Sequence, residues 1–356
     1  MPLIVEGGRI PPRWAREGNY RAPNSAHPQH LSIALINNMP DSALEDTELQ
    51  FFDLLDDASG ELPIYLKLYS LSGIPRTDRG QRHLNSFYYG LDELWQNQFD
   101  GVIITGTEPR QPNLQDEPYW PVLAEVFDWA ERNTISAVLS CLAAHASVLH
   151  SDGIARHRLP DKQFGVFAFA KSLRHPLTVD TPEQVRFPHS RWNEVQADSL
   201  RDCGYTILTQ SADGGVDTFV KKKKQSLFLH FQGHPEYGAE TLLKEYRRDI
   251  RRFLMKERDT YPSMPKSYFD STGERLANDL QALLLEKQGS IPPEELMAGF
   301  PEAALIGALQ KTWQTSSTTI YRNWLQYMIA KKAELPRFRS AVPVAETVER
   351  KPTALG

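Results

Sequence analysis

The sequence predicts an α/β fold with a mostly parallel sheet and helices on both faces. Short apolar runs of strand length alternate with segments in which apolar residues recur at helical spacing. The strand-like runs lie near residues 31–37, 64–70, 99–106 and 135–139, and a helical pattern follows each of them. Strands that alternate with helices in this way form parallel βαβ units. The ligand site of such a sheet lies at the carboxyl ends of its strands.

Composition places the chain among ordinary globular proteins. It has 356 residues, of which 40% are hydrophobic and 24% are charged, so a large core is expected. The net charge of −5 gives no reason to expect a nucleic-acid partner. Cys141 and Cys203 are the two cysteines, which excludes a disulfide scaffold and fits a reducing compartment. The first residues lack the pattern of a signal peptide and no apolar run would span a bilayer, so we expect a cytoplasmic protein without a membrane partner.

Changes in composition and periodicity along the sequence divide the chain into four parts. Residues 1–30 contain several prolines and little periodicity, and we expect an irregular leader there. Residues 31–260 carry the strand and helix patterns and form the expected catalytic domain. Residues 261–335 predict a peripheral helical C-terminal region that includes the Pro- and Thr-flanked segment 292–315. Residues 336–356 are rich in proline and charge, which predicts a flexible tail.

Cys141 is the first candidate for chemistry. It follows the apolar run 135–139 directly and precedes a segment of small and apolar residues that predicts a helix. A sharp bend from a strand to a helix exposes the side chain at the bend and turns backbone N–H groups toward it. The positive end of the helix dipole also favours a thiolate there. Cys141 is therefore a candidate nucleophile, although an isolated cysteine is more often a small core residue.

A histidine and a carboxylate follow a later strand. The run Ser226-Leu-Phe-Leu-His-Phe leads into Gly233-His234-Pro235-Glu236. A carboxylate two residues after a histidine can hold the imidazole in one tautomer and stabilise its protonated form. A strand, a cysteine and a helix followed later by a strand and His-Pro-Glu is the order of the class I glutamine amidotransferases and their relatives. The chain resembles them in this order.

A closer resemblance extends from residue 31 to about residue 256. The chain is similar there to the homoserine O-acyltransferases of methionine biosynthesis, the homoserine O-succinyltransferase family, which shares the amidotransferase-like, flavodoxin-like fold. The stretches that carry the resemblance are Asn38-Met-Pro, His83-Leu-Asn-Ser-Phe-Tyr, Phe99-Asp-Gly-Val-Ile-Ile-Thr-Gly, Tyr119-Trp-Pro, Phe164-Gly-Val-Phe, Pro188-His-Ser-Arg, Gly233-His-Pro-Glu-Tyr, Arg248-Asp and, beyond that range, Asn323-Trp-Leu. Their occurrence in one order is far more specific than any single motif.

The resemblance implies a role for each matching residue. Cys141 would carry the acyl group as a thioester, His234 would be the general base and Glu236 would orient it. The predicted substrate-binding residues are Lys162, Ser190 and Arg248. The substrates implied are an acyl-CoA, with succinyl-CoA preferred over acetyl-CoA, and L-homoserine.

Two further expectations concern the oxyanion and the assembly. Backbone N–H groups near Gly106 and Leu142 are placed to stabilise a tetrahedral oxyanion. The resemblance also implies a homodimer. No bound cofactor is expected, and no metal site either, because the histidines are scattered without the spacing of metal ligands.

The chain departs from the family pattern in three places. Leu142 replaces the tryptophan that usually follows the nucleophile, and His145 lies nearby, where we expect a packed helix residue. Asp41-Ser42 replaces a pair of lysines after Asn38-Met-Pro. Arg110 occupies the position that separates acyl donors, where the family has glycine for succinyl and glutamate for acetyl. An arginine there can pair with the succinyl carboxylate, crowd it out or point to solvent.

The sequence leaves other functions open. The same triad can use acetyl-CoA as the donor, or act on serine or another amino alcohol. A glutamine amidotransferase is disfavoured because no synthetase domain follows. A degenerate relative that acts as a non-catalytic binding protein also fits the departures at Leu142 and Asp41.

Overall fold

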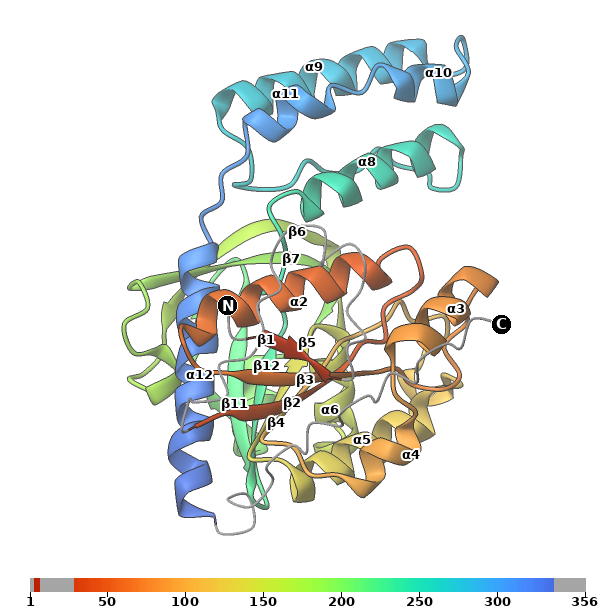
Figure 1. The fold of residues 1–356 in the computed structure, drawn as a ribbon. Coiled ribbons are helices and arrows are strands. Elements are labelled where there is room, and N and C mark those ends of the chain that lie inside the picture. The colour runs from red at the N-terminus through yellow and green to blue at the C-terminus, as the bar shows by residue number, and fades with distance from the viewer. Residues whose placement is uncertain (1–2, 7–28, 336–356) are drawn as a thin grey trace, which may run out of the picture.

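A computed structural model describes residues 3–6 and 29–335, and all structural statements below concern those residues. Their centre is an eight-stranded sheet in the order β1-β3-β2-β4-β5-β12-β11-β8. The six strands from β1 to β12 in this order run parallel, and β11 and β8 add an antiparallel edge. This arrangement confirms the predicted α/β class with a mostly parallel sheet (Figure 1).

The strands are short and mostly buried, as expected for a sheet that helices cover on both faces. Their bounds are β1 (Leu3–Val5), β2 (Leu31–Ile36), β3 (Ile64–Tyr69), β4 (Gly101–Ile104), β5 (Ser136–Ser140), β6 (His157–Lys171), β7 (Gln184–Glu194), β8 (Thr206–Ile207), β9 (Thr209–Ser211), β10 (Gly215–Val216), β11 (Thr218–Lys223) and β12 (Ser226–Phe231). The long strands β6 and β7 belong to a second, antiparallel sheet in the order β10-β9-β6-β7.

Helices cover both faces of the main sheet. Their bounds are α2 (Leu44–Ser59), α3 (Asp78–Phe87), α4 (Leu91–Gln96), α5 (Trp120–Asn133), α6 (Leu142–Asp152), α7 (Ala197–Asp202), α8 (Thr241–Leu254), α9 (Ser271–Lys287), α10 (Pro293–Ala298), α11 (Glu302–Gly307) and α12 (Gln314–Glu334). One apolar core lies between the sheet and α2 with α12, and another between the sheet and α4, α5 and α6. In the described part of the chain, no helix is both long and apolar enough to cross a bilayer.

The start of the chain differs from the predicted irregular leader. Leu3–Val5 forms β1, which pairs in parallel with β3 and is buried at the edge of the sheet. The run was missed because three apolar residues are too few to show a periodicity, whereas an exposed sheet edge gains both hydrogen bonds and apolar contact from any short strand that covers it. Residues 1–2 and 7–28 of the predicted leader lie outside the described residues.

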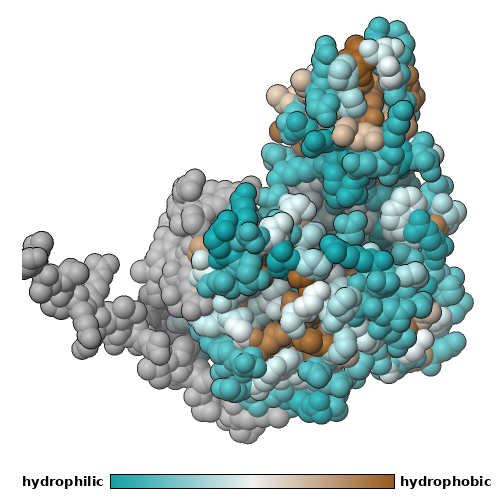
Figure 2. Space-filling view, turned by 90° about the vertical axis from the view of Figure 1, so that its right-hand side faces the viewer, coloured by the Kyte–Doolittle hydropathy of each residue, from teal (hydrophilic) through white to brown (hydrophobic). Residues whose placement is uncertain are grey.

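The C-terminal helices behave in two ways. α9, α10 and α11 pack with α8 and form a unit that projects from the body, as Figure 1 shows at the top. Figure 2 shows apolar residues on the surface of this projecting unit. α12, by contrast, returns to the body: Ile320, Tyr321 and Trp324 are fully buried beside α2 and the sheet. The predicted peripheral position is therefore wrong for α12, because this helix completes the core of the body. The predicted tail, residues 336–356, lies outside the described residues.

The lysine run 221–224 lies at the end of a strand. Lys221, Lys222 and Lys223 belong to β11, and the hairpin turn falls at Lys224 and Gln225. Lys221 and Lys224 form ion pairs of 2.6 and 2.8 Å with Asp152 and Glu131. These acidic partners on α6 and α5 explain why a strand tolerates successive lysines.

Candidate active site

Cys141 lies at a strained bend between β5 and α6. Its backbone has φ 51° and ψ −110°, outside the range that residues other than glycine ordinarily adopt. A conformation of this kind costs on the order of 1–3 kcal/mol and persists where the surrounding structure enforces it. The side chain is half-buried, so the sulfur is not sealed in the core. The bend therefore has the strand–turn–helix geometry that the sequence predicts for a nucleophile.

Parallel pairing brings the predicted site residues to one edge of the sheet. Ser140 at the end of β5 lies opposite Phe231 at the end of β12. The N–H of Cys141 donates a 2.8 Å hydrogen bond to the carbonyl of Phe231. The segments that follow β5 and β12 therefore leave the sheet side by side. One carries Cys141, and the other is the turn that holds His234. β4 ends next to β5 and leads to Gly106 at the same edge.

His234 is held on several sides. Its N–H donates a 2.8 Å hydrogen bond to the carbonyl of Pro188 in β7, which fixes the turn after β12. Nδ1 of its ring lies 2.9 Å from Oε1 of Glu236. Burial alone would lower the pKa of His234, but the Cys141 sulfur and the Glu236 carboxylate raise it well above its ordinary value. The structure therefore brings Cys141, His234 and Glu236 together, with His234 placed to carry a proton.

Gly106 and Leu142 lie in close contact beside the bend. A Cβ added at Gly106 would lie 2.7 Å from Cβ of Leu142 and 3.0 Å from its backbone nitrogen. Only glycine permits this approach, which places the backbone of the β4 end against the first turn of α6. The two residues predicted to donate backbone N–H groups to an oxyanion are thus neighbours at the N-terminus of the helix.

The three predicted substrate-binding side chains form a second cluster around α8. Nζ of Lys162 lies 3.1 Å from Oδ2 of Asp249 and 3.5 Å from Oε2 of Glu245. Ser190 donates a short hydrogen bond to Glu245. Arg248 donates from Nε to Oδ1 of Asp249 at 2.9 Å and keeps 48% of its side chain exposed. Lys162, Ser190 and Arg248 are therefore gathered in space although they come from β6, β7 and α8.

Tyr237 joins the two clusters. Its ring stacks on the His234 ring with centroids 4.1 Å apart and an interplanar angle of 18°. Its hydroxyl donates a 2.7 Å hydrogen bond to Oε1 of Glu245. Burial and Glu245 raise the pKa of Tyr237 well above its ordinary value, so the phenol stays protonated. Tyr237 therefore links the predicted base to Glu245, the carboxylate that Lys162 and Ser190 contact.

Arg110 is not bonded to any of these residues in the structure. Its side chain is exposed, and within the described residues it has no hydrogen bond or ion pair. Its backbone N–H donates to the buried carboxylate of Glu117, as does the N–H of Gln111 at 2.7 Å. Glu117 thus fixes the loop on which Arg110 lies.

Sequence reasoning missed several polar residues here. Glu245 and Asp249 received no role, yet they hold the three predicted substrate-binding side chains. Asp249 lies on the apolar stripe of α8 between Tyr246 and Ile250 and Phe253, which is a signal of burial that the sequence contained. Ser140, which donates a 3.0 Å hydrogen bond to Glu236, had no such signal.

The departures from the family pattern have clear structural settings. His145 is buried and bonds Gln232 at 2.9 Å, and burial lowers its pKa to about 3, so it is a neutral packed helix residue as expected. Asp41 pairs with Arg76 at 3.1 Å and accepts hydrogen bonds from Thr77. The acid that replaces a lysine therefore orders the start of α3.

Within residues 3–6 and 29–335, no three His, Cys, Asp or Glu side chains are grouped as a metal site requires.

Comparison with solved structures gives distant similarities. A glutamine amidotransferase from Thermotoga maritima is 14% identical, with a TM-score of 0.44 over 85% of this chain and 99% of that one. A glutamine amidotransferase from Methylobacillus flagellatus is 12% identical, with a TM-score of 0.45 over 84% and 95% of the two chains.

Sequence relatives are much closer. A protein from Rhodopseudomonas palustris named homoserine O-succinyltransferase is 42% identical over 310 residues, which is 87% of this chain and 92% of that protein. One of the same name from Bradyrhizobium japonicum is 40% identical over 333 residues, 92% of this chain and 99% of its own. A family model described as homoserine O-succinyltransferase matches residues 19–335. The chain belongs to the homoserine O-succinyltransferase family.

Proposed function

We propose that this protein transfers a succinyl group from succinyl-CoA to the hydroxyl of L-homoserine, the reaction that its family's name describes and a step of methionine biosynthesis. The observation that carries the proposal is the arrangement of Cys141, His234 and Glu236 at the carboxyl ends of β5 and β12 in a member of this family. Family membership supports an acyltransferase. The roles of the individual residues are our inference from their geometry.

The first step forms an acyl-enzyme. The sulfur of Cys141 attacks the thioester carbonyl of the donor, a carbon–sulfur bond to Cys141 forms, and the carbon–sulfur bond to CoA breaks. The CoA thiolate leaves with the proton of the His234 imidazolium. The raised pKa of His234 supports this role, because an imidazolium next to the sulfur stabilises the thiolate before the attack and then supplies the proton.

The second step transfers the acyl group to the acceptor. His234, now neutral, takes the proton of the homoserine hydroxyl as that oxygen attacks the thioester of Cys141. The carbon–sulfur bond breaks, the O-acyl product leaves, and the thiolate–imidazolium pair is restored. Glu236 bonds Nδ1 of His234 and so orients the ring. The other ring nitrogen, Nε2, is then left for the proton transfer.

Backbone groups and the second cluster complete the proposed site. The N–H groups at Gly106 and Leu142 stabilise the oxyanion in both steps, a contribution of about 3–4 kcal/mol per donor. Arg248 takes the α-carboxylate of the acceptor, since its guanidinium is half-exposed and can accept a second anionic partner. Lys162 and Ser190 flank it on β6 and β7.

Donor choice is a separate part of the proposal. We infer that succinyl-CoA is preferred over acetyl-CoA, with Arg110 facing the free carboxylate of the succinyl group. The exposed guanidinium of Arg110 and its fixed backbone support this, because a side chain on an anchored loop can turn toward an incoming anion. Acetyl-CoA is the alternative donor, and comparing the two CoA esters on homoserine separates them.

Assembly and location follow the family resemblance. We propose a homodimer in the cytoplasm that acts on small molecules and needs no bound cofactor. Light scattering on the purified full chain measures the mass of the assembly, and a monomer at micromolar concentration would contradict the dimer. Cell fractionation tests the location.

Mass spectrometry of the intact protein tests the central step. After incubation with succinyl-CoA alone, we expect an added mass of one succinyl group on Cys141 and release of one equivalent of CoA. Cys141→Ser should give neither the adduct nor turnover. A wild-type protein that remains unmodified, or an adduct on another residue, would exclude the covalent mechanism and favour a non-catalytic relative. A glutaminase assay tests the amidotransferase alternative.

A further inference from the structure

The motif at residues 188–191 of β7 carries part of the family resemblance, but the proposed reaction steps use only its serine. The carbonyl of Pro188 accepts a 2.8 Å hydrogen bond from the N–H of His234. His189 and Arg191 are both buried. Buried polar side chains that take no part in a reaction still need partners, and those partners show what the side chains hold in place.

Asp217 is a fully buried carboxylate between β10 and β11 that contacts the turn after β12. Its backbone carbonyl accepts the N–H of Gln232 at 3.1 Å, and its Oδ1 accepts the N–H of Gly233 at 2.9 Å. The hydroxyl of Thr218 donates a 2.6 Å hydrogen bond to Oδ2 and so fixes the carboxylate. Together with the bond to β7, three successive N–H groups of the turn are therefore held.

The backbone at Gly233 is enclosed on three sides. An added Cβ there would lie 2.7 Å from Nε2 of His189, 2.8 Å from Oδ1 of Asp217 and 2.8 Å from the carbonyl oxygen of Pro188. Only glycine fits against these groups. They therefore close around the backbone immediately before the proposed base.

Arg191 and Asp217 lie on either side of the His189 ring. Nε of Arg191 donates to Nδ1 of His189 at 3.2 Å, and Nε2 of that ring lies 3.2 Å from Oδ1 of Asp217. A guanidinium only donates, so Nδ1 is the unprotonated nitrogen and the ring proton lies on Nε2, toward the carboxylate. Burial lowers the pKa of His189 to about 4, so the ring is neutral at pH 7. The buried charge of Asp217 is therefore balanced by Arg191 across a neutral ring.

The turn that carries His234 needs anchors outside itself. Glu236 belongs to the same turn, so its bond to Nδ1 of His234 orients the ring within the turn. Three groups from elsewhere in the chain bond the turn, and they belong to Ser140, Pro188 and Asp217. Asp217 holds two N–H groups and brings a negative charge, so it is the strongest of these anchors.

We propose that Asp217 is the residue that positions the general base. It holds the N–H of Gly233, so that the next residue, His234, keeps its ring in line with Cys141. This inference rests on the proposed function and gives a role to a carboxylate outside the triad. A displacement of about 1 Å at a reacting group can cost about 100-fold in rate, so a small shift of this turn is enough to slow both steps.

Kinetics of Asp217→Ala test the proposal. The change leaves the N–H of Gly233 without its acceptor, and we expect kcat to fall about 100-fold. KM for both substrates should stay within about threefold of the wild type, because the groups proposed to bind them lie on other elements. Asp217→Asn keeps a neutral acceptor oxygen, which bonds less strongly than a carboxylate, and should lose only about three- to tenfold in kcat.

The matched control is Asp213→Ala. It makes the same change four residues earlier, at an exposed carboxylate that pairs with Lys266 at 2.6 Å. Its kcat and KM should equal those of the wild type. Thermal unfolding of each variant shows which of them are folded at the temperature of the assay.

The titration of His234 gives a second measurement that a loss of stability alone would not change. The Cys141 sulfur helps to raise the pKa of His234, so a ring that moves away from the sulfur should lose its proton at a lower pH. NMR of the His234 Cε1–H signal should therefore show a lower pKa in Asp217→Ala and an unchanged one in Asp213→Ala.

A folded Asp217→Ala with the wild-type kcat would overturn the proposal, and so would a loss confined to KM. If Asp217→Ala does not fold, Asp217→Asn decides, and wild-type values of both kcat and the His234 pKa in that variant would overturn it. Failure of the proposed function looks different, since the wild type itself would then give no acyl-enzyme with succinyl-CoA.

Discussion

Ser140 donates a 3.0 Å hydrogen bond from its hydroxyl to Oε1 of Glu236, although the two residues lie 96 positions apart in the sequence. Ser140 is the last residue of β5 and directly precedes Cys141. The same Glu236 oxygen lies 2.9 Å from Nδ1 of His234. The strand that presents the proposed nucleophile therefore also steadies the carboxylate that orients the proposed base.

Removal of this hydroxyl should slow the reaction without changing substrate binding. For Ser140→Ala we expect kcat to fall about five- to tenfold, because Glu236 loses one of the two groups that fix it. KM for both substrates should stay near the wild-type value in steady-state kinetics. Ser86→Ala removes an exposed hydroxyl that bonds a carbonyl within α3 and is the matched control. An unchanged kcat in Ser140→Ala would mean that Glu236 needs no such support.

Glu236 should control the protonation of His234. Its negative charge stabilises the imidazolium, so the pKa of His234 should fall in Glu236→Gln, and His234 should lose its proton at a lower pH than in the wild type. Titration of the His234 Cε1–H signal by NMR measures this change directly. A pKa that stays the same or rises would contradict the proposed pairing.

Gly106→Ala should damage the site through a steric clash. The new Cβ would lie 2.7 Å from Cβ of Leu142, so the first turn of α6 must shift and the two proposed oxyanion donors must separate. We expect a loss of at least 100-fold in kcat, the size of the effect of removing one such donor. Gly90→Ala, where an added Cβ meets nothing within 4 Å, should be nearly silent. Equal activities of the two variants would argue against an oxyanion site at Gly106.

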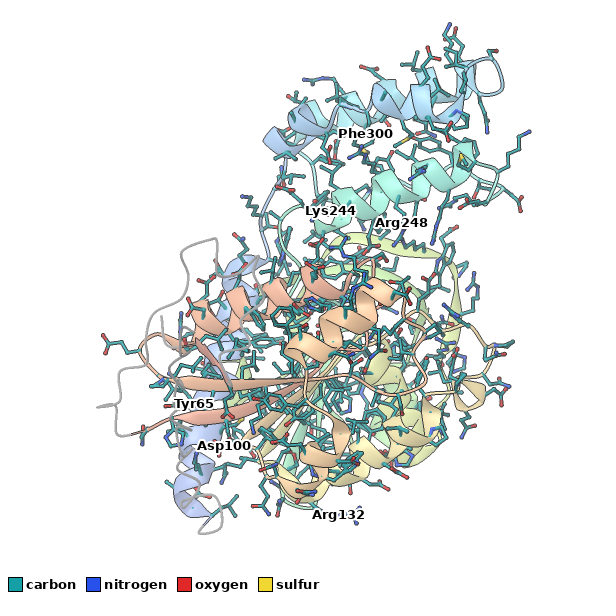
Figure 3. All side chains as sticks on the ribbon, turned by 45° about the vertical axis from the view of Figure 1, so that its right-hand side comes forward. Tyr65, Asp100, Arg132, Lys244, Arg248 and Phe300 are labelled. Atoms are coloured by element: carbon teal, nitrogen blue, oxygen red, sulfur yellow. The ribbon has the colours of Figure 1, made fainter. Side chains whose placement is uncertain are left out.

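Arg110 should affect the choice of acyl donor and little else. In Arg110→Ala, the ratio of kcat/KM for succinyl-CoA to that for acetyl-CoA should fall about five- to tenfold, since a charge-assisted contact to the succinyl carboxylate is lost. Arg132→Ala is the control, because Figure 3 shows Arg132 at the end of the molecule away from Arg248. A ratio that rises in Arg110→Ala would mean that the arginine crowds out the succinyl group.

Three buried histidines should make the fold sensitive to acid. Burial lowers the pKa of His145 and His230 to about 3 and that of His189 to about 4. In the unfolded chain these groups take up protons below about pH 6.5, while the folded chain leaves them neutral. The unfolded state then binds more protons, so the free energy of unfolding must decrease as the pH falls from about 6.5 toward 4, by about 1.4 kcal/mol per pH unit for each histidine.

Urea denaturation at a series of pH values between 7 and 4.5 checks this dependence. His230→Phe removes one buried imidazole but keeps a ring that can stack on Phe219, which lies 4.6 Å from the His230 ring. Its stability should fall less steeply with decreasing pH than that of the wild type. His157→Gln, a change at an exposed position of β6, should keep the wild-type slope. Identical slopes in all three proteins would show that His230 does not remain neutral on folding.

The local pattern of the sequence predicted the framework of the fold well. The apolar runs 31–37, 64–70 and 135–139 all became buried parallel strands, because a strand covered on both faces must be apolar along its length. β1 was missed because its stability comes from the edge of β3, which no local pattern reveals. The burial of α12 was missed for a related reason, since α2 and the strands that cover Ile320, Tyr321 and Trp324 lie far from this helix in the sequence.

By itself, the sequence determined the class of fold, the bend at Cys141 and the pairing of His234 with Glu236, because these depend on residues that are adjacent in the chain. The tertiary structure alone decided that Ser140 supports Glu236 and that Glu245 collects Ser190, Tyr237 and Lys162. Such contacts join β5, β6, β7 and α8, and their geometry follows from how sheets and helices pack. A buried carboxylate acquires its role from the charges that packing brings to it, and those charges lie too far away in the sequence for a local pattern to show.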